Sequence, residues 1–181
     1  MEFYQNHLGE FAALLTAVFW TITALSFESA ANRIGSLSLN IIRLVIGFLF
    51  LSLFTLIRRG ALFPTDAGVQ NWLWLGLSGL VGFVFGDLFL FKSYTIIGSR
   101  FSMLIMTLVP PITVLFSFIM IGEKLAIHHF IGMTITFSGI ALAIFSRQEK
   151  SVRISLKLAP RGIVYALGGA VGQALGLVLS K

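Results

Sequence analysis

The chain of 181 residues has no cysteine, and only 11% of its residues are charged, seven of them acidic. Without thiols it holds no disulfide, thiolate nucleophile or cysteine-ligated metal. Soluble domains carry about 25% charged residues, so the scarcity of charge excludes a soluble enzyme and a disordered regulator. The hydrophobic content of 57% and the mean hydropathy of +0.95 indicate an integral membrane protein instead.

Basic side chains outnumber acidic ones and give a net charge of +6. A nucleic-acid surface gathers Lys and Arg on one soluble face. Here they interrupt apolar runs, as they do in the loops of a multi-pass membrane protein. We therefore expect no nucleic-acid partner. The positive-inside rule places the basic linker 146–161 in the cytoplasm and the N-terminus outside.

Six apolar runs each approach the roughly 20 residues with which a helix crosses a bilayer core about 30 Å thick. Barrel strands are shorter and alternate in polarity. The sequence therefore predicts an all-α integral membrane protein, a polytopic bundle of about six transmembrane helices in the lipid bilayer of a plasma or inner membrane. The expected spans are Phe11–Phe27, Leu37–Ile57, Trp72–Phe91, Phe101–Ile121, Ile127–Phe145 and Gly162–Leu179.

An internal repeat follows the basic linker. Shifting the chain by 153 residues aligns Gly162 with Gly9 and Ala166 with Ala13, among other matches. A repeat unit of five spans forces the second copy to enter the membrane upside down, as in carriers that bind solutes between inverted halves. We therefore predict a five-helix repeat over residues 1–145, a linker over 146–161, and the first helix of a second repeat over 162–181.

Several residues appear in an order and spacing that resemble the EamA-type repeat of the drug/metabolite transporter superfamily. They are Trp20, Asn40-Ile-Ile-Arg43, Pro110, Ile121-Gly-Glu-Lys-Leu125, Gly132 and Gly139. The resemblance implies a secondary-active carrier of ten helices in two repeats, which exports small metabolites, amino acids or drugs. Such carriers usually have both termini in the cytoplasm, which disagrees with the charge count.

The sequence departs from that family pattern because it stops after the first helix of the second repeat. Two interpretations remain open. Either the chain is a secondary-active exporter, with a homodimer or a further segment supplying the second half, or it is a truncated half-transporter or assembly partner without transport activity alone.

Asp87 is the acidic residue that lies well inside an expected span. A charge at mid-bilayer costs about 2.5–3.5 kcal/mol on insertion scales, so we expect a role in proton coupling or in contact with an amine. Topology gathers further charges around the same mouth of the bundle: Glu28, Arg33, Arg43, Lys92 and Arg100. The alternative is a structural ion-pair network with snorkelling side chains.

A substrate pocket is expected between the first and sixth spans. Thr16, Trp20, Thr23 and Phe27 share one helical face. The repeat places Gln173 opposite Trp20. The full set of pocket candidates is Thr16, Trp20, Thr23, Asp87, Tyr94 and Gln173. The alternative is a packing face on which Thr hydroxyls bond between helices.

Glycines and prolines predict features of helix packing. Gly168, Gly172 and Gly176 in the sixth span, and Gly82 and Gly86 in the third, form small-xxx-small patterns that favour close helix pairing. Pro110-Pro111 lies within the fourth expected span and predicts a kink. That kink is either a gating joint or a static bend.

The remaining motifs carry little chemistry. Glu123-Lys124 reads as a short helix connection, and adjacent His128-His129 cannot share one helix face, so we expect no metal site there. No phosphate-binding glycine motif with its lysine is present, and we expect no cofactor. Asp87 has no histidine partner in any span, so the sequence does not predict an enzyme.

Overall fold

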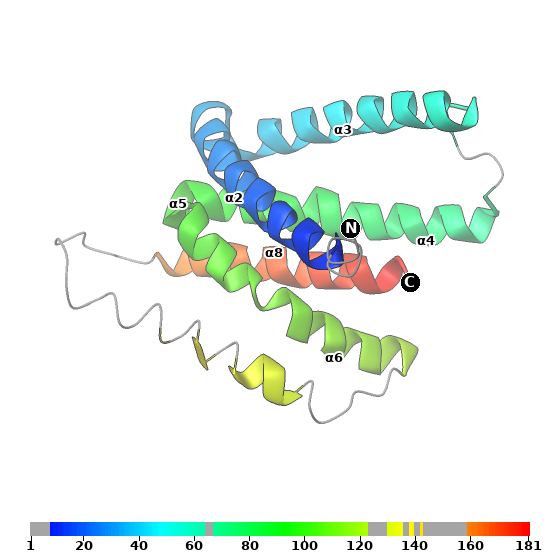
Figure 1. Cartoon of the computed structure of the whole chain (residues 1–181). Coiled ribbons are helices and arrows are strands. Elements are labelled where there is room, and N and C mark those ends of the chain that lie inside the picture. Colours follow the sequence, from blue (N-terminus) through cyan, green and yellow to red (C-terminus); the bar gives the residue numbers. More distant parts are fainter. Residues whose placement is uncertain (1–7, 64–66, 123–129, 136–137, 140–141, 143–158) are drawn as a thin grey trace.

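Residues 8–63, 67–122, 130–135, 138–139, 142 and 159–181 are described by a computed structural model, in which the ordered elements are helical. The all-α prediction is therefore confirmed (Figure 1). The elements are α2 (Leu8–Ile34), α3 (Ser36–Arg59), α4 (Val69–Gly79), the π-helix η1 (Leu80–Gly86), α5 (Asp87–Met106), α6 (Val109–Ile121) and α8 (Pro160–Leu179).

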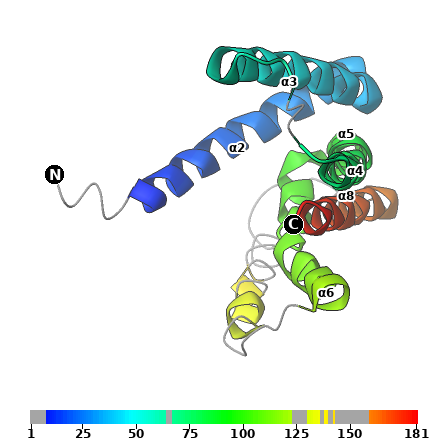
Figure 2. The same cartoon turned by 90° about the vertical axis from the view of Figure 1, so that its right-hand side faces the viewer.

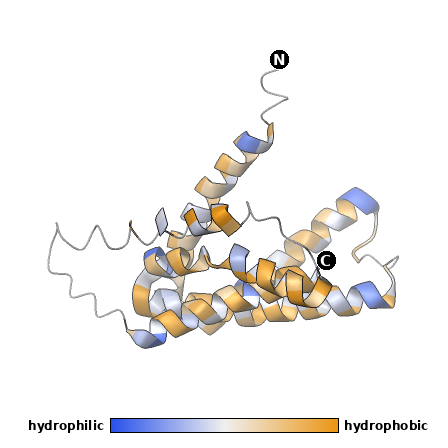
Figure 3. Cartoon of the chain, turned by 90° about the horizontal axis from the view of Figure 1, so that it is seen from below, coloured by the Kyte–Doolittle hydropathy of each residue, from blue (hydrophilic) through white to orange (hydrophobic). Residues whose placement is uncertain are grey.

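Among the described residues, four helical stretches are long and apolar enough to cross a membrane, namely Leu8–Ile34, Ser36–Arg59, Val69–Met106 and Pro160–Leu179, the third of which is interrupted at Gly98. The shorter apolar α6 returns alongside them. Hydrophobic residues dominate the helices in Figure 3, and large side chains such as Phe50 (68% exposed) and Ile57 (74% exposed) face outward. Lipid chains are the natural surroundings for such a surface. The expected span 127–145 lies largely outside the described residues, although 130–135 is helical.

The ends of α3 and α8 agree with the expected spans within two residues, whereas α2 continues seven residues beyond the expected end at Phe27. The end of α3 is marked by clear local signals. Arg58 and Arg59 lie in the last turn of α3, where cations complement the helix dipole. Gly60 follows with a left-handed backbone (φ 72°), and its N–H donates to the carbonyl of Leu56. A glycine in this conformation ends a helix at little steric cost.

The break between the expected spans Trp72–Phe91 and Phe101–Ile121 is shorter than the gap between them. Helix α5 continues through this stretch, and only Gly98 leaves the helical region, with φ 80° and ψ 158°. A break between the third and fourth spans is thus confirmed at Gly98, while Ser93 stays helical, with its buried hydroxyl donating to the carbonyl of Leu90 at 2.7 Å. A serine whose hydroxyl bonds back to its own helix needs no loop. The chain reverses direction within α5 (Figure 1).

The prolines of the fourth span lie at a helix start and not in mid-helix. The helix breaks at a turn over Thr107 and Leu108, and α6 begins at Val109 with Pro110 in its first turn. A proline is tolerated there because its missing N–H would have had no intrahelical partner. The bend of this span therefore precedes Pro110-Pro111, and a gating role for it stays a prediction.

Helix α8 packs antiparallel along α4, η1 and α5 (Figures 1 and 2). The contact uses glycines from both sides: a Cβ added at Gly172 would lie 2.7 Å from the Cα of Gly86, and one at Gly176 would lie 2.9 Å from the Cα of Gly82. The packing role predicted for these glycines is confirmed, and their partner is the third span of the same chain.

Helices α2 and α3 cover the opposite side of α5. Phe27 of α2 meets Phe91 of α5 edge to face, with ring centroids 5.1 Å apart. Near the start of α3, Leu39 and Asn40 are buried, whereas the second half of α3 diverges from the bundle (Figure 2). The first half of α3, α2, α5 and α8 thus surround one interior space.

Candidate functional site

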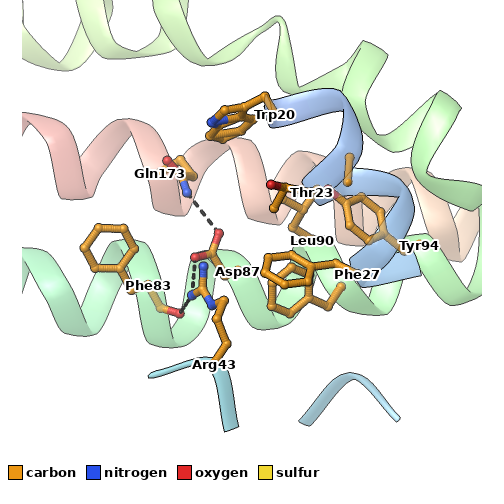
Figure 4. A pocket seen from close by; sticks show the side chains of 11 residues that line it. Trp20, Thr23, Phe27, Arg43, Phe83, Asp87, Leu90, Tyr94 and Gln173 are labelled. Atoms are coloured by element: carbon orange, nitrogen blue, oxygen red, sulfur yellow. Dashed lines mark hydrogen bonds and ion pairs between the residues drawn. The ribbon is translucent and has the colours of Figure 1, made fainter. Parts of the chain in front are cut away.

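That interior space is a cavity of about 340 Å³ (Figure 4). Side chains from α2, α3, η1, α5 and α8 meet there although they are far apart in sequence. The lining residues are Trp20, Thr23, Ala24, Phe27, Arg43, Phe83, Asp87, Leu90, Phe91, Tyr94 and Gln173.

A carboxylate forms the polar centre of the cavity. Asp87 is 3% exposed. Its Oδ2 lies 2.5 Å from Nη2 of Arg43 on α3, and its Oδ1 accepts a hydrogen bond of 2.9 Å from Nε2 of Gln173 on α8. One side chain therefore ties three helices together. Removing a single partner would leave a buried polar group unsatisfied, which is the costly case for such clusters.

One nitrogen of the Arg43 guanidinium, Nη2, makes several hydrogen bonds, whereas Nε makes none among the described residues. Besides Asp87, Nη2 approaches the carbonyl of Phe83 at 3.3 Å and Oδ1 of Asn40 at 3.2 Å. The guanidinium carbon lies 5.1 Å from the ring centroid of Phe91, within cation–π range. Its Nε is buried without a hydrogen-bond partner among the described residues.

Aromatic rings form much of the cavity wall. Phe91 packs between Phe27 and Tyr94, with its ring centroid 5.8 Å from that of Tyr94. The Tyr94 hydroxyl points to Sδ of Met103 at 3.2 Å. Trp20 closes the wall from α2 and remains 48% exposed. Aromatic walls around a few polar groups are typical of small-molecule sites.

The structure brings most of the predicted pocket residues to this cavity. Trp20, Thr23, Asp87, Tyr94 and Gln173 all line it. Thr16 does not, because it lies toward the start of α2, where its exposed hydroxyl donates to the carbonyl of Ala12 at 2.7 Å. A substrate role for the lining residues stays a prediction.

The charges expected around one mouth are distributed over separate places. Arg43 lines the cavity with Asp87, whereas Glu28 accepts a hydrogen bond from Ser99 beside the break at Gly98. Lys92 and Arg100 are exposed, and no ion pair within the described ranges joins either of them to Glu28. Glu123-Lys124 and His128-His129 lie outside the described residues.

Some residues in or beside the cavity were not identified from the sequence. Asn40, which bonds to the lining residue Arg43, was noted only as part of a motif, although its spacing of three residues from Arg43 places both on one helical face. The phenylalanines Phe83 and Phe91 carried no separate signal, because 18 phenylalanines are spread through the chain. Only helix packing distinguishes those that face the cavity from those that face outward.

Comparison with known proteins gives one match. A model of the EamA-like transporter family matches residues 7–145, a range that includes the elements from α2 to α6. No curated protein and no solved structure matches the chain. The family match covers four of the helices that build the cavity walls and ends before α8 and Gln173.

Proposed function

Because the chain belongs to the EamA-like transporter family, we propose that it is a secondary-active exporter of small organic solutes bound in the cavity described above. The family and the apolar helices make it a multi-pass membrane transporter. Export of metabolites, amino acids or drugs, across a plasma or inner membrane, is the proposed activity.

The observation that carries this proposal is the carboxylate of Asp87, held by Arg43 and Gln173 from two other helices. A solute that takes one of these partners weakens a contact between helices. Its free energy of binding then differs between two arrangements of the bundle, and such a difference is what a ligand needs to shift a conformational equilibrium. Alternating access requires this coupling.

The size and walls of the cavity support a small solute with an apolar part. Its volume of about 340 Å³ lies at the lower end of the roughly 300–1,000 Å³ usual for ligand pockets. Phe27, Phe91 and Tyr94 offer ring surfaces, while Asp87 and Arg43 offer an acceptor and a donor. Both a cationic and an anionic group of a solute would find a partner.

We further propose that a proton gradient drives export through Asp87. A proton on this carboxylate would remove its charge and weaken its attraction to Arg43, which lies 2.5 Å away. Solute and proton would then act on the same ion pair. Intramembrane carboxylates commonly serve as proton relays in pumps and transporters.

The inverted-repeat organisation is proposed on two features. The end of α2 and the start of α8 lie at the same end of the bundle, since Glu28 bonds to Ser99 and Gly162 packs on Ile97. Helix α8 thus crosses the bundle in the opposite sense to α2, as an inverted second copy of the first span would. Trp20 and Gln173, which the 153-residue shift aligns, both line the cavity. Residues 1–145 would then form one repeat and 162–181 the first helix of the next.

Proteoliposomes test the transport proposal directly. Purified protein is reconstituted into vesicles loaded with a radiolabelled L-amino-acid mixture or with ethidium, and release is followed after a proton gradient is imposed. Thr23→Val is expected to slow release because it removes a cavity hydroxyl. The matched control is Thr21→Val, on the same helix but away from the cavity, where the hydroxyl bonds to the carbonyl of Ala17.

Asp87→Asn is expected to abolish gradient-driven release while the folded protein is recovered from the membrane in near-normal amount. Release at the wild-type rate from this variant would contradict the proton-coupling role. Loss of the folded protein would support the alternative of a structural ion pair. If no loaded solute is released by the wild-type protein beyond the leak of protein-free vesicles, the exporter proposal fails for those solutes.

A further inference from the structure

We propose that Asn40 is a positioning residue that holds the Arg43 guanidinium on Asp87. It also fixes the geometry of the π-helix η1 (the π turn), which Asp87 directly follows. This inference rests on the proposed function insofar as it assigns the cavity to solute binding. Its structural part concerns α3 and the helix Val69–Met106 alone.

Both ends of the Asn40 amide are engaged. The side chain belongs to a residue only 2% exposed. Its Nδ2 donates to the carbonyl of Val84 at 2.9 Å, and its Oδ1 accepts from Nη2 of Arg43 at 3.2 Å. Asn40 therefore links the guanidinium to the backbone of the third span. A leucine of similar size would make neither bond.

The carbonyls contacted from α3 belong to a distorted stretch of helix. The N–H of Asp87 bonds to the carbonyls of Gly82 and Val84, whereas a regular α-helix would direct it to Phe83, four residues back. The Phe83 carbonyl accepts from Arg43 instead, at 3.3 Å. Side chains of α3 thus donate hydrogen bonds to two carbonyls of η1, those of Phe83 and Val84. The Asp87 N–H does not bond to the Phe83 carbonyl.

The wide turn decides where Asp87 points. A π turn contains one residue more than the α turn it replaces, and each helical residue advances by about 100° around the axis. If the turn relaxed to α geometry, the residues after it would rotate by about that angle relative to those before. Asp87 is the first residue after η1, so it would lose its alignment with Arg43 and Gln173 (Figure 4).

The opposite face of the turn is held by α8. Gly86 has backbone atoms of Gln173 and Gly172 within 3.1–3.2 Å of the place where a Cβ would be, so this side is packed against backbone. On the α3 side, the bonds to η1 come from Asn40 and Arg43. Asn40 has no formal charge to be drawn to a solute, so it can hold the turn while Arg43 changes partner.

The backbone amide of Asp87 can be observed selectively, because aspartate is rare in this chain. The sequence has two aspartates, Asp66 and Asp87, so protein made with [¹⁵N]aspartate in a cell-free system gives two backbone amide signals. Asn40→Leu is expected to shift the Asp87 signal and to speed its exchange with deuterated water about tenfold. The matched control Ser38→Leu, at an exposed position of α3, is expected to leave it unchanged.

Transport kinetics separate a positioning role from a merely structural one. For a solute that wild-type vesicles release, Asn40→Leu is expected to raise KM about tenfold with little change in Vmax per folded protein, and Asn40→Gln to recover part of the loss. Adding Asn40→Leu to an Arg43→Gln chain is expected to change KM little further. An unchanged Asp87 amide, or equal KM effects with and without Arg43, overturns the proposal.

If Asn40→Leu does not fold, Asn40→Ser is measured in its place, since it keeps a polar group and leaves room. The amide measurement needs no transported solute. If the exporter proposal fails, the inference about the π turn is still decided by the amide measurement alone.

Discussion

Replacing Gly172 with alanine tests the closest contact in the bundle. The added Cβ would lie 2.7 Å from the Cα and 3.1 Å from the N of Gly86, and 3.2 Å from the carbonyl oxygen of Val81. Carbon atoms pack best at about 3.5–4.0 Å, so the closest contact is short by about 1 Å. All three neighbours are backbone atoms, which cannot turn aside as a side chain could. Helix α8 must therefore move away from η1.

The expected cost follows from comparison with Gly47→Ala on α3, where an added Cβ meets nothing within 4 Å. Both substitutions gain the same helix propensity, which cancels in the difference. What remains is the overpacking penalty, typically about 1–3 kcal/mol. This corresponds to about a 5- to 150-fold difference in the folded-to-unfolded ratio.

A thiol reporter measures that difference. Because the chain has no cysteine, a single Ser93→Cys substitution at a position with 0% exposure gives a label site that reacts only when the bundle opens. Its rate of alkylation is followed as the fraction of dodecyl sulfate in mixed micelles rises. If Gly172→Ala and Gly47→Ala open at the same detergent fraction, the close approach of α8 to η1 is not what stabilises the fold.

Two further outcomes are expected in the same Ser93→Cys background. Gly98→Ala should destabilise the bundle by about 1–3 kcal/mol, since φ 80° with ψ 158° is a conformation that is essentially restricted to glycine, and alkylation matching that of Gly47→Ala would contradict this. Arg43→Gln should lower the stability of the bundle more than Asp87→Asn does. The first change leaves the Asp87 carboxylate unpaired at 4% exposure, and the second leaves the Arg43 guanidinium unpaired at 25% exposure. The double variant should regain stability over Arg43→Gln, and a simple sum of the two losses in the double variant would show that the charges do not act as a pair.

The polar centre of the cavity coincides with a packing junction. Asp87 receives Arg43 from α3 and Gln173 from α8, and the same stretch of helix carries the glycines on which α8 packs. Under the proposed function, a solute that competes for Asp87 or Arg43 would act where three helices meet. Small shifts at such a junction are passed to whole helices because packed interfaces adopt discrete arrangements.

The sequence by itself determined the membrane-spanning helices and the glycine packing. Hydropathy is a local property, so runs such as Leu37–Ile57 predicted α3 closely, and Gly60 marked its end. Small residues four apart likewise predicted a close helix contact, because the missing side chains themselves permit it. Asp87 was identified because a carboxylate inside an apolar run is costly wherever its partner lies.

Only the tertiary structure decided which side chains meet. The sequence placed Arg43 and Glu28 in one charged mouth, but helix packing directs Arg43 to Asp87 in the cavity and Glu28 to Ser99 at the break. It also gave no sign of the π turn, because one extra residue in a turn changes neither composition nor length of an apolar run. That residue rotates everything after it by about 100°. The partners of Asp87 therefore depend on a backbone register that is fixed by packing against α3 and α8.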